Sequence, residues 1–122
     1  MTYVVLDTNF ILSCVKKKID FFTEIPFKGL KIIIPIQVLD ELRNISSEGK
    51  GRFRDDAKIG LKILENKEFK RIDLHMKNVD NGIVKLASNH KEYVIATLDN
   101  GIKNRIRNKK LVIRGETQLE II

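Results

Sequence analysis

Short apolar runs alternate with helical patterns along the chain, and this alternation limits the folds open to it more than any other feature. The runs lie at 3–6, 31–35, 69–74, 93–98 and 111–114. Strands of a parallel sheet read as continuous apolar runs, because helices cover both faces of the sheet. The sequence therefore predicts a three-layer α/β/α domain with a mostly parallel central sheet of about five strands.

The segments between these runs carry helical spacing or helix-start signals. Helices are expected within 9–23, over 36–45, from Asp55 to about Asn66, from Asp80 to about Asn89, and, short and basic, over 102–106. Pro35 ends the second run and can open the next helix, where a missing N–H is not needed. The stretch 46–54 contains two glycines, two serines and three cations without apolar periodicity, which predicts a mobile basic loop.

The totals indicate one domain spanning residues 1–122, since this length suits a single hydrophobic core. No apolar run approaches the roughly 20 residues that a membrane helix needs. The chain starts without the apolar region of a secretion signal, and its one cysteine, Cys14, can form no internal disulfide. We therefore expect a cytoplasmic protein without membrane contact, in which Cys14 is a buried small hydrophobic residue.

Four acids stand where a parallel sheet binds its ligands, in the crevice beyond the carboxyl ends of the strands. Asp7 follows the first run directly, and Asp99 follows the fourth. Glu41 lies on the helix after the second run, and Asp80 opens the helix before the fourth. These four carboxylates are expected to face one edge of the sheet.

Each acid also has a simpler interpretation. Asp7 is a good N-cap for the helix that follows it, and Asp80 begins an ordinary helix start. The pair Asn100 and Gly101 after Asp99 is a hairpin signal, although the apolar residues at 102 and 106 are four apart and favour a helix. The joint occurrence of four such coincidences is much less probable than any one of them.

Helical spacing predicts that Glu41 lies on or beside the buried stripe of its helix and that Asp80 is on the inward side of its own. Glu41 shares a face with three apolar residues of its helix, while Asp40 falls on the other side, and Asp80 continues into an apolar face of its own helix. A carboxylate on a buried stripe is costly unless it is paired, neutral or bound to a metal. The alternative for Glu41 is a rim position on a solvated face.

The chain is basic, with a formal net charge of +7, and a polyanion is a plausible partner. The cations gather in three clusters: Lys16, Lys17 and Lys18; Lys50, Arg52 and Arg54; and Lys103, Arg105, Arg107, Lys109 and Lys110. Neither histidine has metal-ligand spacing, so all-oxygen ligation favours Mg²⁺ or Mn²⁺ over zinc. The sequence contains no dinucleotide-binding, P-loop or nucleophilic-serine motif.

Four segments in this order resemble the PIN domain family of nucleases: VVLDTNFIL, PIQVLDEL, VDNGIVKLA and VIATLDNGIKNRI. The resemblance extends from Tyr3 to about Ile113. It implies that Asp7, Glu41, Asp80 and Asp99 are catalytic metal ligands, with Asn9 and Thr97 as polar supports. Many members of the family carry a second acid near the third motif, where this chain has Asn81, so the four acids are expected to hold one divalent ion.

The resemblance implies a function as well as a site. It implies a Mg²⁺- or Mn²⁺-dependent endoribonuclease that leaves a 5′-phosphate, either a VapC-like toxin with a cognate antitoxin protein or an RNA-processing enzyme. A homodimer is common among such relatives. The residues expected to contact RNA phosphates are Lys50, Arg52, Arg54, Lys103, Arg105 and Arg107.

Two other classes of protein share some of these features. A non-catalytic PIN module, for example in rRNA maturation, would bind RNA or protein without cutting, but a pure RNA binder gains nothing from an anionic pocket. A receiver-like signalling domain also has acids, a threonine and a parallel sheet. It requires an aspartate after a middle strand, and the runs 31–35 and 69–74 do not supply one in that place.

Overall fold

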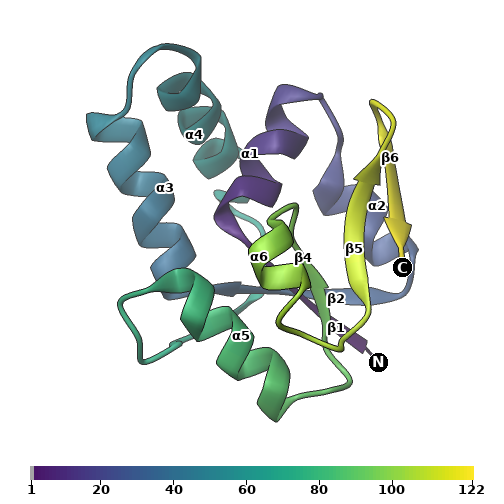
Figure 1. Ribbon diagram of the computed structural model, residues 1–122. Helices are drawn as coiled ribbons and strands as arrows, with labels where there is room; N and C mark the ends of the chain where they lie inside the picture. Colours follow the sequence, from purple (N-terminus) through teal and green to yellow (C-terminus); the bar gives the residue numbers. More distant parts are fainter. Residues whose placement is uncertain (1) are drawn as a thin grey trace.

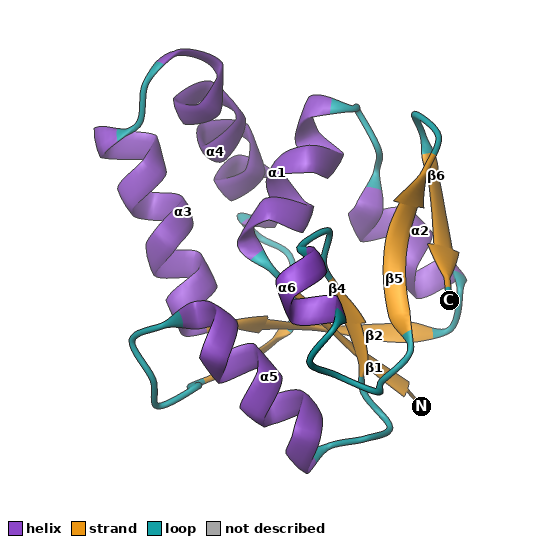
Figure 2. Ribbon diagram, in the orientation of Figure 1, coloured by secondary structure: helices purple, strands orange, loops and turns teal. Residues whose placement is uncertain are grey.

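Helices and strands alternate along residues 2–122, the part of the chain that the computed structural model describes (Figures 1 and 2). The elements are β1 (Thr2–Leu6), α1 (Thr8–Lys16), α2 (Phe21–Phe27), β2 (Leu30–Pro35), α3 (Ile36–Glu48), α4 (Gly51–Leu64), β3 (Lys70–Ile72), α5 (Val79–Asn89), β4 (Val94–Ala96), α6 (Asn100–Lys103), β5 (Lys110–Arg114) and β6 (Gln118–Ile121). Each predicted strand and helix is present, with shifted ends.

The strands form one sheet in the order β3-β2-β1-β4-β5-β6. All neighbours are parallel except β5 and β6, which form an antiparallel hairpin at one edge. The mostly parallel three-layer fold is thereby confirmed, but the sheet has six strands instead of about five. The sequence pattern missed β6 because only Leu119 of its four residues is buried, so the strand lacks an apolar run.

The order of the strands decides which face each helix covers. The chain moves from β1 to β2 to β3, and then crosses back to β4 before continuing to β5. Because parallel crossovers are right-handed, this reversal puts α5 and α6 on the opposite face from α1 to α4. Figure 1 shows α5 below the sheet and α1, α3 and α4 above it.

The core lies on both faces of the central strands. Val4, Val5 and Leu6 of β1 are fully buried, as are Phe10 of α1 on one side and Ile83 of α5 on the other. Burial on both faces explains why β1 reads as an unbroken apolar run and not as an alternating one. At about 1.5–3 kcal/mol for each large apolar side chain, this burial is the main source of stability.

The predicted mobile loop at 46–54 is wrong. Helix α3 continues to Glu48 and α4 begins at Gly51, so that only Gly49 and Lys50 connect them. The two helices pack closely against each other as a hairpin, and this packing outweighs the weak helix propensity of the serines and glycines. Asp55 and Asp56 consequently lie within α4, and not near its start.

Two further expectations concern the environment of the chain. Within residues 2–122, no helix combines the length and the hydrophobicity that a membrane crossing requires. Cys14 is fully buried in α1, and its burial, with a smaller effect from the charge of Glu24, raises the pKa of the thiol to about 12. The thiol is therefore a packing group and not a nucleophile at neutral pH.

We predict that Gly82→Ala destabilises the protein, because α5 packs closely against Leu74 at this glycine. A Cβ at this position would lie 2.9 Å from side-chain carbons of Leu74. Overpacking of this kind typically costs about 1–3 kcal/mol, to be measured as the free energy of unfolding in urea. Ser88→Ala, at an exposed position of the same helix, is the control, and equal stabilities of the two variants would contradict the prediction.

Candidate active site

The carboxyl ends of β1 and β4 meet at the point where the strand order reverses. The chain leaves β1 toward β2 and leaves β4 toward β5, so the two following segments diverge. The backbone N–H of Asp7 donates to the carbonyl of Ala96 at 3.0 Å, which extends the pairing of the two strands by one residue. This divergence opens the crevice in which α/β sheets bind their ligands.

Asp7 occupies the centre of this crevice with a side chain that is only 3% exposed. Its Oδ1 accepts a hydrogen bond from the Thr8 backbone N–H at 2.8 Å, and its Oδ2 accepts one from the Thr97 hydroxyl at 3.0 Å. Asp7 therefore does cap α1, as the simpler interpretation of the sequence proposed. A capping aspartate does not usually need a second, buried donor from another strand, so capping alone does not account for its setting.

The surroundings of Asp7 oppose its ionisation. The pKa of this carboxyl is raised from 3.8 to about 6, mainly by burial. The hydrogen bonds from Thr97 and Thr8 lower it, and the nearby charges of Asp80 and Glu41 contribute smaller increases. Two other carboxylates are thus close enough to act on Asp7 through space. A cation that entered the crevice would relieve both the desolvation and the repulsion.

Thr97 links Asp7 to Asp99. The hydroxyl of Thr97, fully buried at the end of β4, donates to Asp7 and accepts the backbone N–H of Asp99 at 3.1 Å. The side chain of Asp99 in turn caps α6, accepting the Ile102 N–H at 3.2 Å. A Cβ at Gly101 would lie 2.8 Å from Oδ1 of Asp99, so alanine at this position would displace the capping carboxylate. The Asn100 and Gly101 pair therefore serves a helix start and not a hairpin.

Glu41 reaches the site from α3. The hydroxyl of Thr8 donates a short hydrogen bond to Oε1 of Glu41, so one turn of α1 contacts two of the predicted acids. Glu41 was expected on or beside the buried stripe, and it lies beside the stripe, since the residue is exposed, while Asp40 faces away and pairs with Arg43. The sequence gives no signal for this role of Thr8 beyond its place at the start of a predicted helix.

Asp80 lies at the start of α5 but does not open it. Asn78 is the N-cap, with its side chain accepting the Asn81 N–H at 2.9 Å, and the helix begins at Val79. Asp80 is exposed and not turned inward as predicted. Its place in the first turn also favours a negative charge, because the helix dipole is positive there.

The four carboxylates approach the same edge without forming a finished metal site. Among the residues that the structure describes, no three acidic, histidine or cysteine side chains are close enough to form a metal-binding cluster. Nor does any of the four form an ion pair within residues 2–122. The donors are all oxygens, one of them buried with a raised pKa and unneutralised, and such a set suits a hard divalent cation.

Of the remaining predicted residues, Arg105 is tied to the helix that carries Asp80. Arg105 donates from Nη1 to Oδ1 of Asn81 at 3.0 Å, which brings it to the first turn of α5. Asn9 is exposed in the first turn of α1, and Lys103 is half-buried on α6. Arg107 is exposed beyond α6. Arg105 is therefore held next to Asp80 by the neutral amide of Asn81.

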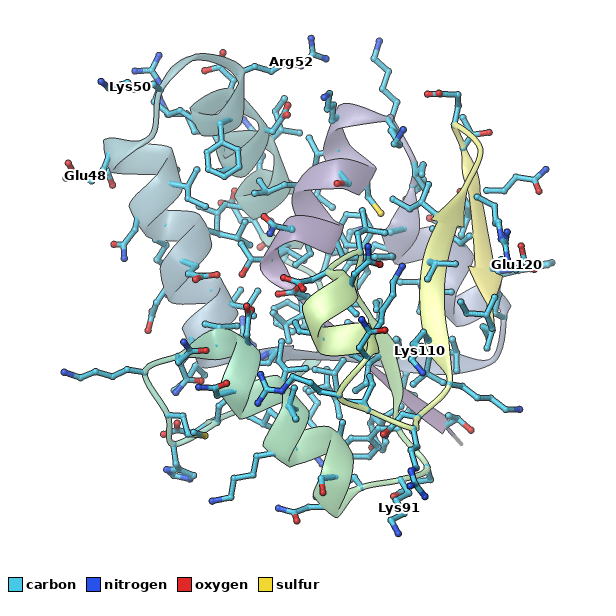
Figure 3. The ribbon with its side chains drawn as sticks, in the orientation of Figure 1. Glu48, Lys50, Arg52, Lys91, Lys110 and Glu120 are labelled. Atoms are coloured by element: carbon cyan, nitrogen blue, oxygen red, sulfur yellow. The ribbon has the colours of Figure 1, made fainter. Side chains whose placement is uncertain are left out.

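The predicted basic cluster of Lys50, Arg52 and Arg54 lies farther from the four acids. Figure 3 shows Lys50 and Arg52 at the connection between α3 and α4, at the opposite end of α3 from the sheet. Arg54 is on the first turns of α4, 3.8 Å from a carboxylate oxygen of Asp55. These three cations are thus carried by a helical hairpin and not by a mobile loop.

The chain belongs to the family described as PIN like domain, whose profile matches residues 4–115. Among curated proteins it is 30% identical over 107 residues to the rRNA-processing protein fcf1 of Schizosaccharomyces pombe, covering 86% of this chain and 53% of that protein. The chain thus spans about half the length of this relative. It is also 24% identical to Ribonuclease VapC4 of Methanocaldococcus jannaschii, covering 99% of this chain and 97% of that protein.

Solved structures give the same fold. The PIN domain endonuclease Utp24 superposes with a TM-score of 0.77 at 29% identity, covering 98% of this chain and 90% of that one. A chain of VapBC2 from Rickettsia felis, bound to a DNA fragment from its promoter, superposes with a TM-score of 0.61 at 20% identity, covering 93% and 100%. This second likeness concerns the fold alone.

We predict that Asp7→Asn stabilises the metal-free protein at about pH 8. The folded-state pKa of Asp7 lies above its ordinary value, so its contribution to stability is present below about pH 4 and is lost as the pH rises through about 6. A shift of the pKa from 3.8 to about 6 corresponds to about 3 kcal/mol in the free energy of unfolding. This is an upper bound on the stability that the neutral amide adds.

The measurement is urea unfolding in the presence of a chelator, at about pH 8 and about pH 4. The advantage of Asp7→Asn should disappear at the lower pH, where the carboxyl of the wild type is already protonated. A variant that is less stable than the wild type at both pH values would show that the ionised carboxylate stabilises the fold, contrary to the prediction.

Proposed function

We propose that this protein is a metal-dependent endoribonuclease that hydrolyses RNA phosphodiester bonds at the edge of the sheet beyond β1 and β4. The observation that carries the proposal is Asp7, a buried carboxylate whose pKa is raised to about 6, with Glu41 and Asp80 close enough to raise it. A fold gains nothing from such repulsion, and sites with strongly perturbed acids are often functional.

Mg²⁺ or Mn²⁺ is the cofactor that these donors suit, with Asp7 and Asp99 as the principal ligands and Glu41 and Asp80 as the others. The ion would supply Lewis-acid activation of a water molecule and of the scissile phosphate. The support is chemical: all four donors are carboxylate oxygens, and none is paired with a lysine or arginine within residues 2–122.

The chain's own residues position and charge the site. Thr97 fixes the orientation of Asp7 from one side and the Thr8 N–H fixes it from the other, so the carboxylate is held in place before any ligand arrives. Thr8 also holds Glu41 through its hydroxyl. Above about pH 6 Asp7 is anionic, and the site is then ready to bind a cation.

RNA is the proposed substrate because of the relatives and the charge of the chain. One relative is named a ribonuclease and another an rRNA-processing protein. The net charge of +7 attracts a phosphate backbone toward acids that alone would repel it. Lys103, Arg105 and Arg107 follow Asp99 in the chain and are the proposed phosphate contacts at the site, and Lys50, Arg52 and Arg54 are more distant ones.

A role in RNA processing is favoured over a toxin role. Utp24 and fcf1 are the more similar relatives, at 29% and 30% identity, against 24% for VapC4. A cognate antitoxin and a homodimer, which the toxin reading entails, draw support only from VapC4 and from the fold of VapBC2. Co-expression with a small neighbouring gene product would distinguish the two roles.

We predict that the purified protein cleaves single-stranded RNA in the presence of Mn²⁺ and that Glu41→Gln lowers the rate at least about a hundredfold. The charge of Glu41 is lost while its length is kept, and losing one such group commonly costs a factor of this size. The measurement is the initial rate of cleavage of a labelled RNA. Asp7→Asn should be equally impaired.

The matched control is Asp40→Asn, which removes a carboxylate one residue away on the outer face of α3, where it pairs with Arg43. This variant should keep the wild-type rate. If Asp40→Asn and Glu41→Gln lose activity to the same degree, the effect is one of helix stability and the assignment of Glu41 fails. Equal activity of Asp7→Asn and wild type would reject Asp7 as a ligand.

We further predict that Mn²⁺ raises the melting temperature more at about pH 7.5 than at about pH 5. Protons compete with the cation for Asp7, whose pKa is about 6, so binding strengthens as the pH rises. Calorimetry or a thermal shift assay reports this without any turnover. The rise should vanish in Asp7→Asn, and a pH-independent rise that survives this substitution would place the ion elsewhere.

A further inference from the structure

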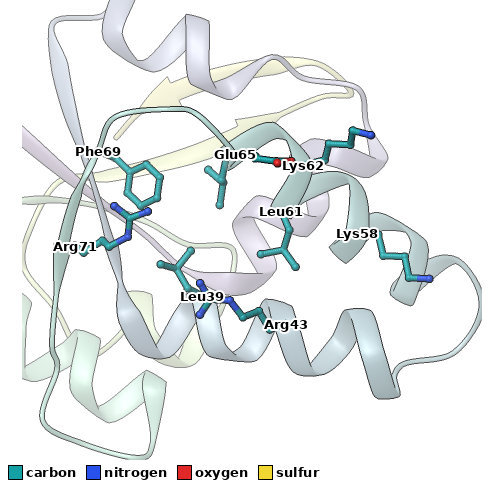
Figure 4. A pocket seen from close by; sticks show the side chains of 9 residues that line it. Leu39, Arg43, Lys58, Leu61, Lys62, Glu65, Phe69 and Arg71 are labelled. Atoms are coloured by element: carbon teal, nitrogen blue, oxygen red, sulfur yellow. The ribbon is translucent and has the colours of Figure 1, made fainter.

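Two hollows lie side by side along the β3 edge of the sheet. The first, of about 450 Å³, is formed by α3, α4 and β3, and Figure 4 shows its lining. The second, of about 430 Å³, is formed by α2, β2, β3 and the start of β1. Phe69 lines both, so the two hollows form a continuous surface, here called the β3 groove.

The β3 groove is strongly cationic. Its basic residues are Arg43, Lys58, Lys62 and Arg71 in the first hollow and Lys31 and Lys70 in the second. The lining contains two acids, Glu65 and Glu68, and Asp40, outside the lining, pairs with Arg43. The cations come from helices and strands that are far apart in the sequence, and the predicted basic clusters include none of them.

Aromatic rings lie among these cations. The guanidinium of Arg71 stacks over the ring of Phe69 at 4.3 Å, and the amine of Lys70 lies 5.1 Å from the centre of the Tyr3 ring. The ring of Phe22 meets that of Phe69 edge to face at 6.0 Å. Surfaces that combine a cationic track with stacking planes are typical of single-stranded nucleic acid binding.

We propose that the β3 groove binds single-stranded RNA, with its lysines and arginines on the phosphates and a base against the plane of Arg71 and Phe69. The identity of the polyanion as RNA rests on the proposed function. A protein strand adding to the sheet is disfavoured, since β3 has only three residues and two of them, Lys70 and Arg71, are charged.

The groove lies on the other side of α3 from the candidate active site. Glu41 and Arg43 are two positions apart on this helix, about 200° around its axis, so they flank its buried stripe on opposite sides. Strand β3 is separated from β1 by β2 alone, a lateral distance of about 10 Å. RNA in the groove would therefore lie near the site but outside it, as a second point of attachment.

The test is RNA affinity in the Asp7→Asn background, which prevents cleavage during the measurement. The probe is a fluorescein-labelled oligouridylate of about 20 nucleotides, longer than one binding site of this kind. Adding Lys58→Glu and Lys62→Glu should weaken binding at least about tenfold at low salt. The slope of log K against log salt should also fall by about 1.4, since two phosphate contacts to a single strand are lost.

The matched control carries the same change of charge elsewhere. Lys85→Glu with Lys91→Glu alters two exposed lysines on and beside α5, across the sheet from the groove. This pair should leave the affinity within about twofold, because screened charges at a distance act weakly. If both pairs weaken binding equally, attraction is non-specific and the proposal fails.

A second measurement tests the stacking plane. The chain has no tryptophan, so Phe69→Trp creates a single fluorescent reporter inside the groove. Oligouridylate should quench its emission with the same Kd as in the affinity assay, whereas inorganic polyphosphate should bind without quenching it. Binding of RNA that leaves the emission unchanged would place the RNA elsewhere.

These outcomes are separable from the proposed function. One outcome is cleavage that depends on Asp7 and Glu41, with an RNA affinity that Lys58→Glu and Lys62→Glu leave unchanged. This would overturn RNA binding in the β3 groove and leave the proposed nuclease activity intact. Affinity that depends on the groove without any cleavage would show an RNA-binding module. Preference for a protein or for polyphosphate over RNA in direct competition would overturn the choice of RNA.

Discussion

The candidate active site is arranged around a carboxylate that is held out of water where two strands diverge. Each oxygen of Asp7 receives one hydrogen bond from the protein, from the Thr8 backbone and from the Thr97 hydroxyl. These bonds lower the pKa, but burial prevails and keeps it at about 6. At neutral pH the fold therefore holds an anion that it only partly stabilises, and a bound cation is the natural complement of that arrangement.

This position is a consequence of the order of the strands. Because the strand order reverses between β1 and β4, the segments that follow these parallel strands diverge and leave a crevice at the Asp7 side chain. The same reversal sends α5 to the far face, where its first turn reaches the edge at Asp80. Residues separated by more than 70 positions thus meet without any long loop, and Gly82 permits the close approach of α5 that this requires.

Positions at the ends of strands could be predicted from the sequence, whereas positions that depend on the rotation of a helix could not. Asp7, Thr97 and Asp99 lie at one edge because parallel strands end there together. Asp80 was predicted to face inward but is exposed, and Glu41 lies beside the buried stripe and not on it, since helical spacing shows which residues share a face and not how far the helix is turned. The stretch 46–54 was mistaken for a loop because the packing of α3 on α4 is a tertiary effect that local composition does not contain.

The distribution of charge explains how a basic chain keeps an acidic crevice available. With 23 lysines and arginines against 16 acids, ion pairing at the site would be easy, and it would neutralise the crevice. Arg105, the cation that the structure brings to the first turn of α5, instead donates to the neutral amide of Asn81. An amide fixes the guanidinium without cancelling its charge, whereas a carboxylate at 81 would hold it as an ion pair. If the protein acts as proposed, Asn81 keeps Arg105 available for a phosphate and Asp80 available for a cation.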